Sequence, residues 1–105
     1  MASAKRRVIE SPLPQGEHER IAYTVPTTLW GGGGTSPIVT VLDTTDATPV
    51  DVTSATTLGS ATIAGDIITT PYVFGLTADR RYRVNVQWSK GSQILETFFE
   101  LLAEL

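Results

Sequence analysis

The chain has 105 residues, 41 % hydrophobic and 18 % charged, which is the size of one ordinary domain and neither a disordered nor a membrane-spanning composition. It has no cysteine, which excludes disulfides and cysteine zinc sites, and its formal net charge of −3 argues against general binding to nucleic acid. No apolar run approaches the roughly 18 residues of a transmembrane helix, so we expect no membrane contact either.

The β-branched residues Thr, Val and Ile make up 32 of the 105 residues, and nine Gly and six Pro are spaced among them. β-branched side chains lose rotamer freedom in helices and pack well on a pleated surface. This composition predicts an all-β fold of many short strands, either a sandwich or a barrel.

Residues 1–20 show no strand period and contain Pro12 and Pro14. We expect them to form an extended N-terminal arm that precedes a single domain over residues 21–105. The arm has a basic tip and the domain is acidic, so the arm of one copy is suited to dock on a neighbour, the alternative being a solvated terminus. The arm residues expected at a partner interface are Lys5, Arg6, Arg7, Val8, Ile9 and Leu13.

The domain begins with an alternating segment over residues 21–25, which predicts a strand with one buried face that Pro26 ends. Four consecutive glycines at 31–34 follow and predict a flexible loop. Trp30, directly before them, is expected to close one end of the core.

Three more elements are expected in the middle of the chain. Residues 38–42 form an apolar run and predict a strand buried on both faces; a turn and a short edge strand at residues 50–52 follow it. Two Thr-rich segments, 58–64 and 67–70, flank a Gly-Asp pair and predict a hairpin at a sheet edge.

The strongest pattern is the strict alternation of apolar and polar residues from Tyr82 to Trp88. A period of two over seven residues predicts a strand with Tyr82, Val84, Val86 and Trp88 in the core. A Leu shortly before the Tyr that opens such a strand is typical of a tyrosine corner, in which the Tyr hydroxyl bonds to the backbone at a sandwich crossover.

The C-terminal residues 94–105 fit two structures. A strand directs Phe99 to the core and Phe98 outward, whereas a helix gives an apolar stripe but stacks three glutamates at unfavourable i,i+4 spacing. We predict a strand to about Leu101 with a frayed or helical end. An exposed Phe98 beside two carboxylates then indicates either a contact with another subunit or partial cover by the arm.

Residues suited to catalysis lack the arrangement that catalysis needs. His18, the single histidine, lies in a segment with nothing to orient it, and the glycines at 31–34 lack the lysine of a phosphate-binding loop. Asp43, Asp46 and Asp51 are oxygen donors for Ca²⁺ in principle, but their spacing matches no EF-hand, and turn formation accounts for them. We therefore expect no enzymatic activity, no catalytic or metal site and no cofactor.

The basic cluster Arg80, Arg81 and Arg83 has two interpretations. It either contacts an anion or an acidic partner, or it forms a solvated strand face. Arg81 and Arg83 can also pair with glutamates of the next strand, and such exposed pairs contribute only about 0.2–1 kcal/mol. Arg81 and Arg83 join Phe98 as expected interface residues. The residues expected to be structural are Tyr82, Trp30, Trp88 and Phe99.

The run from Ile38 to Leu102, "IVTVLD…DVTSATTLGSATIAGDIITTPYVFGLTADRRYRVNVQWSKGSQILETFFELL", resembles small immunoglobulin-like virion proteins encoded among the structural genes of tailed bacteriophages. The opening segment "ERIAYTV…TTLW" is also similar to theirs, so the resemblance covers about residues 20–102. Their pattern is T-x-x-V-x-G-L-x-x-x-x-x-Y-x-V, and fibronectin-type domains share its Leu-to-Tyr portion. The matching positions are Thr70, Val73, Gly75, Leu76, Tyr82 and Val84.

This resemblance implies an immunoglobulin-like or fibronectin-III-like antiparallel β-sandwich and a non-enzymatic part of the virion: a capsid decoration, or a neck or tail accessory. It implies other virion proteins as partners and many symmetric copies or a homo-oligomer, and it supplies no catalytic residue. On this view deletion of residues 1–19 abolishes assembly and leaves the fold intact. The alternative is a stand-alone module that binds carbohydrate or a host surface. Trp30, Tyr72, Phe74 and Trp88 suit an aromatic platform for a sugar, but we expect them to fill the core instead, since the domain has few aromatic residues.

Overall fold

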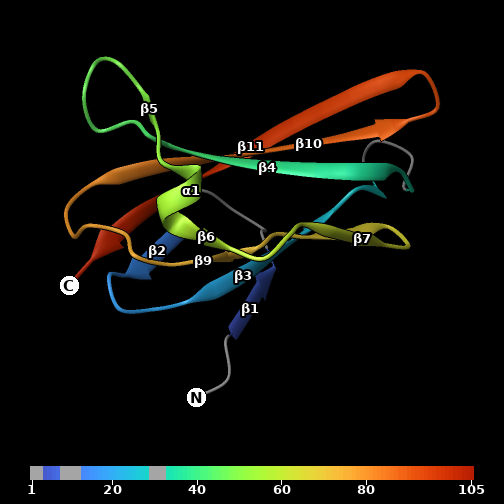
Figure 1. The fold of residues 1–105 in the computed structure, drawn as a ribbon. Coiled ribbons are helices and arrows are strands. Elements are labelled where there is room, and N and C mark those ends of the chain that lie inside the picture. The colour runs from blue at the N-terminus through green and yellow to red at the C-terminus, as the bar shows by residue number, and fades with distance from the viewer. Residues whose placement is uncertain (1–3, 8–12, 29–32) are drawn as a thin grey trace.

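The computed structural model describes residues 4–7, 13–28 and 33–105, the first of these segments by its backbone. Two β-sheets, rich in antiparallel pairs, pack face to face, and their inward side chains form one shared core (Figure 1). The expected all-β architecture of two layers is confirmed. Trp30, Val8 and Ile9 lie outside the described residues.

The first sheet has the strand order β6-β9-β3-β8-β7, with β1 paired to β3. Both β8 and β9 run antiparallel to β3, so they act as one strand interrupted at residues 70–71. The expected hairpin is present as β7 and β8, and it forms the edge of the sheet. The strands of this sheet are β1 (Ala4–Arg7), β3 (Ile21–Pro26), β6 (Thr57–Leu58), β7 (Thr62–Ala64), β8 (Ile67–Thr69) and β9 (Tyr72–Val73).

The second sheet has the order β2-β11-β10-β4-β5. The C-terminal segment is a strand, as predicted, and it continues to Glu104 instead of fraying near residue 101. One helical turn, α1 (Thr53–Thr56), follows the short edge strand and was not predicted. The strands are β2 (Leu13–Gly16), β4 (Thr35–Asp43), β5 (Val50–Asp51), β10 (Arg81–Lys90) and β11 (Gln93–Glu104).

The core confirms the two strongest patterns in the sequence. The four apolar residues of β10 predicted to face inward are each at most 3 % exposed, and Phe99 of β11 is 1 % exposed. The ring of Tyr23 in β3 lies 5.1 Å from the ring of Phe99, so this tilted aromatic pair joins the two sheets.

A glycine closes the loop over Trp88, near the end of β10. Gly34 has a φ of +118°, and a Cβ there would lie 2.7 Å from Cδ1 of Trp88, so only glycine lets the loop close over the indole.

The predicted bond between the hydroxyl of Tyr82 and the backbone is present. The N–H of Thr77 donates to that hydroxyl at 2.9 Å, and Leu76 beside it is buried. The bond fixes the turn that carries the chain from β9 in the first sheet to β10 in the second.

The prediction that residues 38–42 are buried on both faces is wrong. Val39 and Val41 point into the core, whereas Ile38 is 56 % exposed. The reason is that no element among the described residues covers the outer face of the second sheet (Figure 1). An antiparallel sheet with one open face needs only alternate residues to be apolar, so the run of apolar residues here is not a sign of double burial.

The stretch expected to be an arm contributes two strands to the sheets. β1 runs parallel to β3, and β2 runs parallel to the end of β11 with Leu13 opposite Leu101. Leu13 packs against the core and Gln15 is fully buried, so the sandwich begins before residue 21. The alternation in this strand is hidden because its second inward residue is a glutamine instead of an apolar residue.

Candidate protein interface

The outward side chains of β4, β10 and β11, which we call the outer face, form a mixed apolar and polar surface. The register places Asn85 of β10 between Thr40 of β4 and Phe98 of β11. In the next row Gln87 lies between Ile38 and Glu96. The outward positions of β10 are thus polar. Large apolar side chains flank them, Phe98 on the β11 side and Ile38 on the β4 side. Those most exposed are Ile38 at 56 %, Ile94 at 69 % and Phe98 at 50 %.

The best-defined contact on the outer face is between Arg83 and Phe98. The guanidinium carbon lies 3.7 Å from the centroid of the ring, and Nε donates to Oδ1 of Asn85 at 3.1 Å. Such cation–π contacts contribute about 0.5–1 kcal/mol at exposed sites. The stack places an aromatic ring and an arginine against each other, and both residue types are enriched in the cores of protein interfaces.

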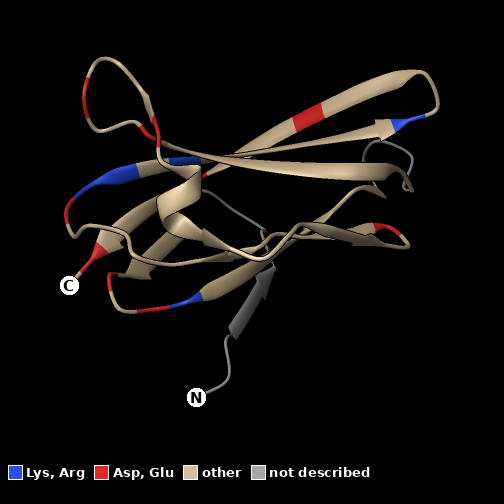
Figure 2. Ribbon diagram, in the orientation of Figure 1, with Lys and Arg blue, Asp and Glu red and all other residues tan. Residues whose placement is uncertain are grey.

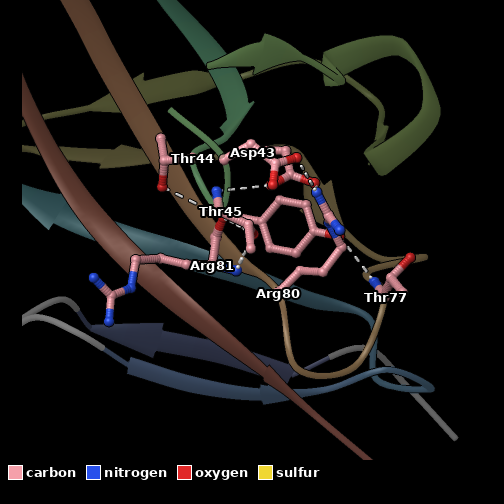
Figure 3. A network of polar contacts seen from close by, with 8 residues as sticks. Asp43, Thr44, Thr45, Thr77, Arg80 and Arg81 are labelled. Atoms are coloured by element: carbon pink, nitrogen blue, oxygen red, sulfur yellow. Dashed lines mark hydrogen bonds and ion pairs between the residues drawn. The ribbon is translucent and has the colours of Figure 1, made fainter. Parts of the chain in front are cut away.

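The three arginines expected as one cluster are divided between two roles. Arg81 and Arg83 lie on the outer face, where they oppose Leu102 and Glu100 of β11. The backbone of Arg81 is fixed by Thr45, whose hydroxyl accepts its N–H at 2.8 Å (Figure 3). Arg80 turns away from both of them, into a network at the end of the sandwich.

That network is an ion-pair cluster made by two loops. Nε of Arg80 lies 2.6 Å from Asp43, and its terminal nitrogen lies 3.1 Å from Asp46 (Figure 3). Burial alone raises the pKa of Asp43, but hydrogen bonds from Arg80 and from Thr45 outweigh it, so the net pKa is lowered. The hydrogen bonds to Asp43 and Asp46 also raise the pKa of Arg80. Arg80 therefore neutralises acidic groups of its own chain.

The aspartates weighed as a Ca²⁺ site have structural partners in the structure. Asp43 and Asp46 bind Arg80, and Oδ1 of Asp51 accepts hydrogen bonds from both the N–H and the hydroxyl of Thr53. The hydrogen bond from the N–H of Thr53 contributes most to lowering the pKa of Asp51, and the bond from its hydroxyl adds to it. Within residues 4–7, 13–28 and 33–105, no group of three or more His, Cys, Asp or Glu side chains is placed to hold a metal.

Of the aromatic residues weighed as a sugar platform, the three that the structure describes do not share one surface. Trp88 is buried in the core, and Arg20 lies over the ring of Phe74 at 5.5 Å. Tyr72 borders a shallow depression on the other sheet, together with Leu58 and several threonines. His18 is in a turn with its side chain 91 % exposed, beside Glu17.

The interface residues predicted from the N-terminal stretch do not join the outer face. Lys5, Arg6 and Arg7 belong to β1, whose backbone pairs with β3 in the first sheet. Leu13 is half-buried and packs against the core, so it also has a structural role, and its place at an interface stays a prediction. Ile38 and Ile94 were not predicted as interface residues. Their alternation with buried neighbours along β4 and β11 is the signal that could have identified them.

Charge is distributed unevenly over the second sheet. Figure 2 shows most acidic and basic residues in the loops and near the strand ends, with one acidic band midway along β11 and long uncharged stretches between them. Between Val84 and Phe99, which includes most of the β10–β11 hairpin, the charged residues are Lys90 and Glu96. This part of the hairpin thus has little charge to oppose the approach of an apolar partner, whereas Arg81, Arg83 and Glu100 lie at its other end.

No family model, no curated protein and no solved structure matches this chain. In the part of the chain that the structure describes, no helix is long and apolar enough to cross a membrane.

Proposed function

We propose that this chain is a non-enzymatic structural subunit of a tailed-bacteriophage particle, a capsid decoration or a neck or tail accessory, that docks on other particle subunits through its outer face. Its fold would be immunoglobulin-like. The tyrosine-corner bond between Thr77 and Tyr82 and the N-terminal β2 alongside the last strand support that class. The resemblance of residues 20–102 to small virion proteins supports the location.

The observation that carries the docking role is the stacked pair of Arg83 and Phe98 on a sheet face that no described element covers. Phe98 keeps 50 % of its surface exposed, and Ile94 and Ile38 nearby are more exposed still. Large exposed side chains on a rigid sheet cost little conformational entropy when a partner buries them. An aromatic ring and an arginine at the centre of such a surface are typical of binding hot spots.

The test measures occupancy in purified particles. The tagged chain is expressed during infection by the phage that encodes it, and its ratio to the major particle subunit is determined by quantitative mass spectrometry. We expect a fixed ratio for the native chain and a loss of about tenfold or more for Phe98→Ala and for Arg83→Ala. Ile67→Ala, which truncates an exposed apolar side chain of β8 on the other sheet, is the matched control and keeps full occupancy.

Each variant is checked by circular dichroism and thermal unfolding of the isolated chain, so that loss of docking is separated from loss of fold. Absence of the native chain from particles would overturn the virion role. Full occupancy of the Phe98→Ala particle would overturn the docking surface.

A second function, binding of carbohydrate, rests on the depression beside Tyr72. Its lining combines an aromatic ring with the hydroxyls of Thr62 and Thr69, which is a combination suited to a sugar. A glycan array distinguishes the two functions, because this one requires a signal that Tyr72→Ala removes and Phe98→Ala leaves unchanged.

A further inference from the structure

An open cleft lies at the end of the sandwich where β10 begins and β11 ends. It has a volume of about 450 Å³ and is bordered by the loop that follows β4 and by the last residues of β11. Three charged side chains in its lining lie outside the ion-pair cluster of Arg80: those of Asp79, Arg81 and Glu104. Leu102 gives the cleft an apolar part. The cleft therefore presents charge of both signs to its surroundings.

The arginine cluster at 80–83 leaves one guanidinium without a partner. Arg80 is held by two aspartates, and Arg83 is stacked on the ring of Phe98. The backbone of Arg81 is hydrogen-bonded to the loop after β4, but its guanidinium forms no ion pair or hydrogen bond with any residue that the structure describes. Figure 3 shows this guanidinium pointing away from the ion-pair cluster. The positive charge of Arg81 is therefore available to a partner.

The two carboxylates of the cleft are also available. Asp79 and Glu104 are exposed, and neither side chain forms an ion pair or a hydrogen bond within residues 4–7, 13–28 and 33–105. Arg80 does not neutralise them, because it already binds the two aspartates of the loop after β4. The available groups of the cleft are thus one guanidinium and two carboxylates. A site with this excess of negative charge attracts a further cation.

The register of the last hairpin places these groups relative to one another. Arg81 of β10 opposes Leu102 of β11, and Glu104 lies two residues further along β11 on the same face. A cation and a carboxylate therefore lie on either side of a half-buried leucine. Such a patch is complementary to itself, because a two-fold axis near Leu102 places the cation of each copy opposite the carboxylate of the other.

We propose that this end of the outer face is an interface between two copies of the chain, related by a two-fold axis near Leu102. The guanidinium of Arg81 from each copy enters the cleft of the other and pairs there with Glu104, with Asp79 beside it. The two leucines meet at the axis. Because Arg81 and Glu104 lie on neighbouring strands, the strands of the two copies cross at a steep angle, which is one of the two ways in which sheets pack.

The charges favour a second copy over an unrelated partner. A partner at this cleft must offer a cation to the carboxylates and a carboxylate to Arg81, at the spacing that the hairpin sets. The chain itself has this arrangement, so one contact surface satisfies both halves of the pair. The pairing goes beyond the proposed function, because it concerns the isolated chain and Leu102 lies four residues from Phe98 along β11. Its failure therefore leaves docking on a particle untouched.

The test measures the mass of the full chain by sedimentation velocity over a range of concentrations. We expect a concentration-dependent dimer at low salt that is weaker at about 1 M salt, where the Debye length is only about 3 Å. Arg81→Glu and Glu104→Arg each place like charges opposite one another twice in the dimer, and each should weaken it about tenfold or more. Lys90→Glu reverses a charge at the other end of β10 and is the matched control, which retains the dimer.

A combined variant separates loss of the contact from misfolding. Arg81→Glu together with Glu104→Arg restores opposite charges across the axis, so it should dimerise about tenfold more tightly than either single variant. A native chain that is monomeric at all concentrations overturns the proposal, and so does a dimer that both single variants leave unchanged. Weakening in the single variants without recovery in the combined variant shows that Arg81 does not meet Glu104, and it overturns the proposed axis.

Discussion

The phenolic hydroxyl of Tyr23 donates a hydrogen bond to Oε1 of Gln15 at 2.5 Å, and neither side chain has any exposed surface. Nε2 of Gln15 donates in turn to the carbonyls of Val73, at 2.8 Å, and Glu19, at 3.2 Å. Gln15 belongs to β2 in the second sheet, whereas Tyr23 and Val73 belong to the first. One buried amide therefore ties the two sheets together.

Gln15→Leu should lower the free energy of unfolding by about 1–3 kcal/mol. The leucine fills the space but leaves the hydroxyl of Tyr23 and the carbonyl of Val73 without this buried partner, which is the costly case for a polar group. Urea denaturation of Gln15→Leu, Tyr23→Phe and the double variant measures the coupling. The double variant should lose clearly less than the sum of the single losses, and additive losses would show that the bond contributes nothing.

Deletion of residues 1–19 should destabilise the isolated domain instead of sparing it. The deletion removes β2, its pairing with Leu101–Glu104 and the amide of Gln15. We expect the midpoint of thermal unfolding to fall by about 10 °C or more, since 1 kcal/mol corresponds to about 4–8 °C in a domain of this size. Deletion of residues 1–12 keeps β2 and is the control. Equal midpoints for the two truncated chains would mean that β2 adds no stability.

The sequence predicts this fold where alternation is long and its inward residues are apolar. Tyr82 to Trp88 meets both conditions, and the corner that places Tyr82 under the N–H of Thr77 was predicted from the Leu shortly before that Tyr. β2 meets neither, because four residues show one alternation and Gln15 is inward for its hydrogen bonds instead of its hydrophobicity. A single apolar run such as 38–42 also does not reveal that its outer side is uncovered, which depends on the rest of the fold.

The candidate interface was predictable only in part, for a related reason. Phe98 was identified because the strand period of β11 directs Phe99 inward, which the structure confirms. The sequence did not reveal that Arg80 is separated from Arg81 and Arg83. That separation depends on aspartates some 34 to 37 positions away, which a loop brings to Arg80. Sequence period specifies the face of a strand, whereas the partner of a loop residue depends on tertiary structure.

Tyr82→Phe should lower the free energy of unfolding by roughly 1 kcal/mol. The hydroxyl accepts the partly buried N–H of Thr77 at 2.9 Å, and a neutral hydrogen bond of this kind contributes about 0.5–1.5 kcal/mol. The ring stays in the core, so the contribution of its packing to the free energy of unfolding is unchanged. Chemical denaturation measures the difference, and Tyr72→Phe on the half-buried β9 is the control. A loss no larger than that of the control would remove the corner bond as a source of stability.

Phe98→Ala and Phe99→Ala should differ strongly in the isolated chain. Phe99 is 1 % exposed, and truncation of a buried phenylalanine costs about 3–5 kcal/mol. Phe98 is 50 % exposed, and its loss costs the remaining contacts and the stack with Arg83, about 1 kcal/mol. Both variants are measured at a concentration where the native chain is monomeric. Equal losses would contradict the register of β11.

The ion pair of Asp43 and Arg80 should make stability depend on pH in the acid range. The pKa of Asp43 is lowered in the folded chain because the hydrogen bonds from Arg80 and Thr45 outweigh partial burial. A lowered folded pKa means that the unfolded chain binds the proton more tightly, so the contribution is complete above the ordinary aspartate value of 3.8 and is lost as the pH falls through the folded pKa. Asp43→Asn should therefore be less stable than the native chain at pH 6, and the difference should shrink steadily below pH 3.8. Denaturation midpoints across that range measure this difference.

Arg80→Gln in the same series should remove most of the dependence on Asp43, because it takes away the strongest hydrogen-bond donor to that carboxylate. A native-minus-Asp43→Asn difference that is constant from pH 6 to the acid limit would show that the pair does not stabilise the fold.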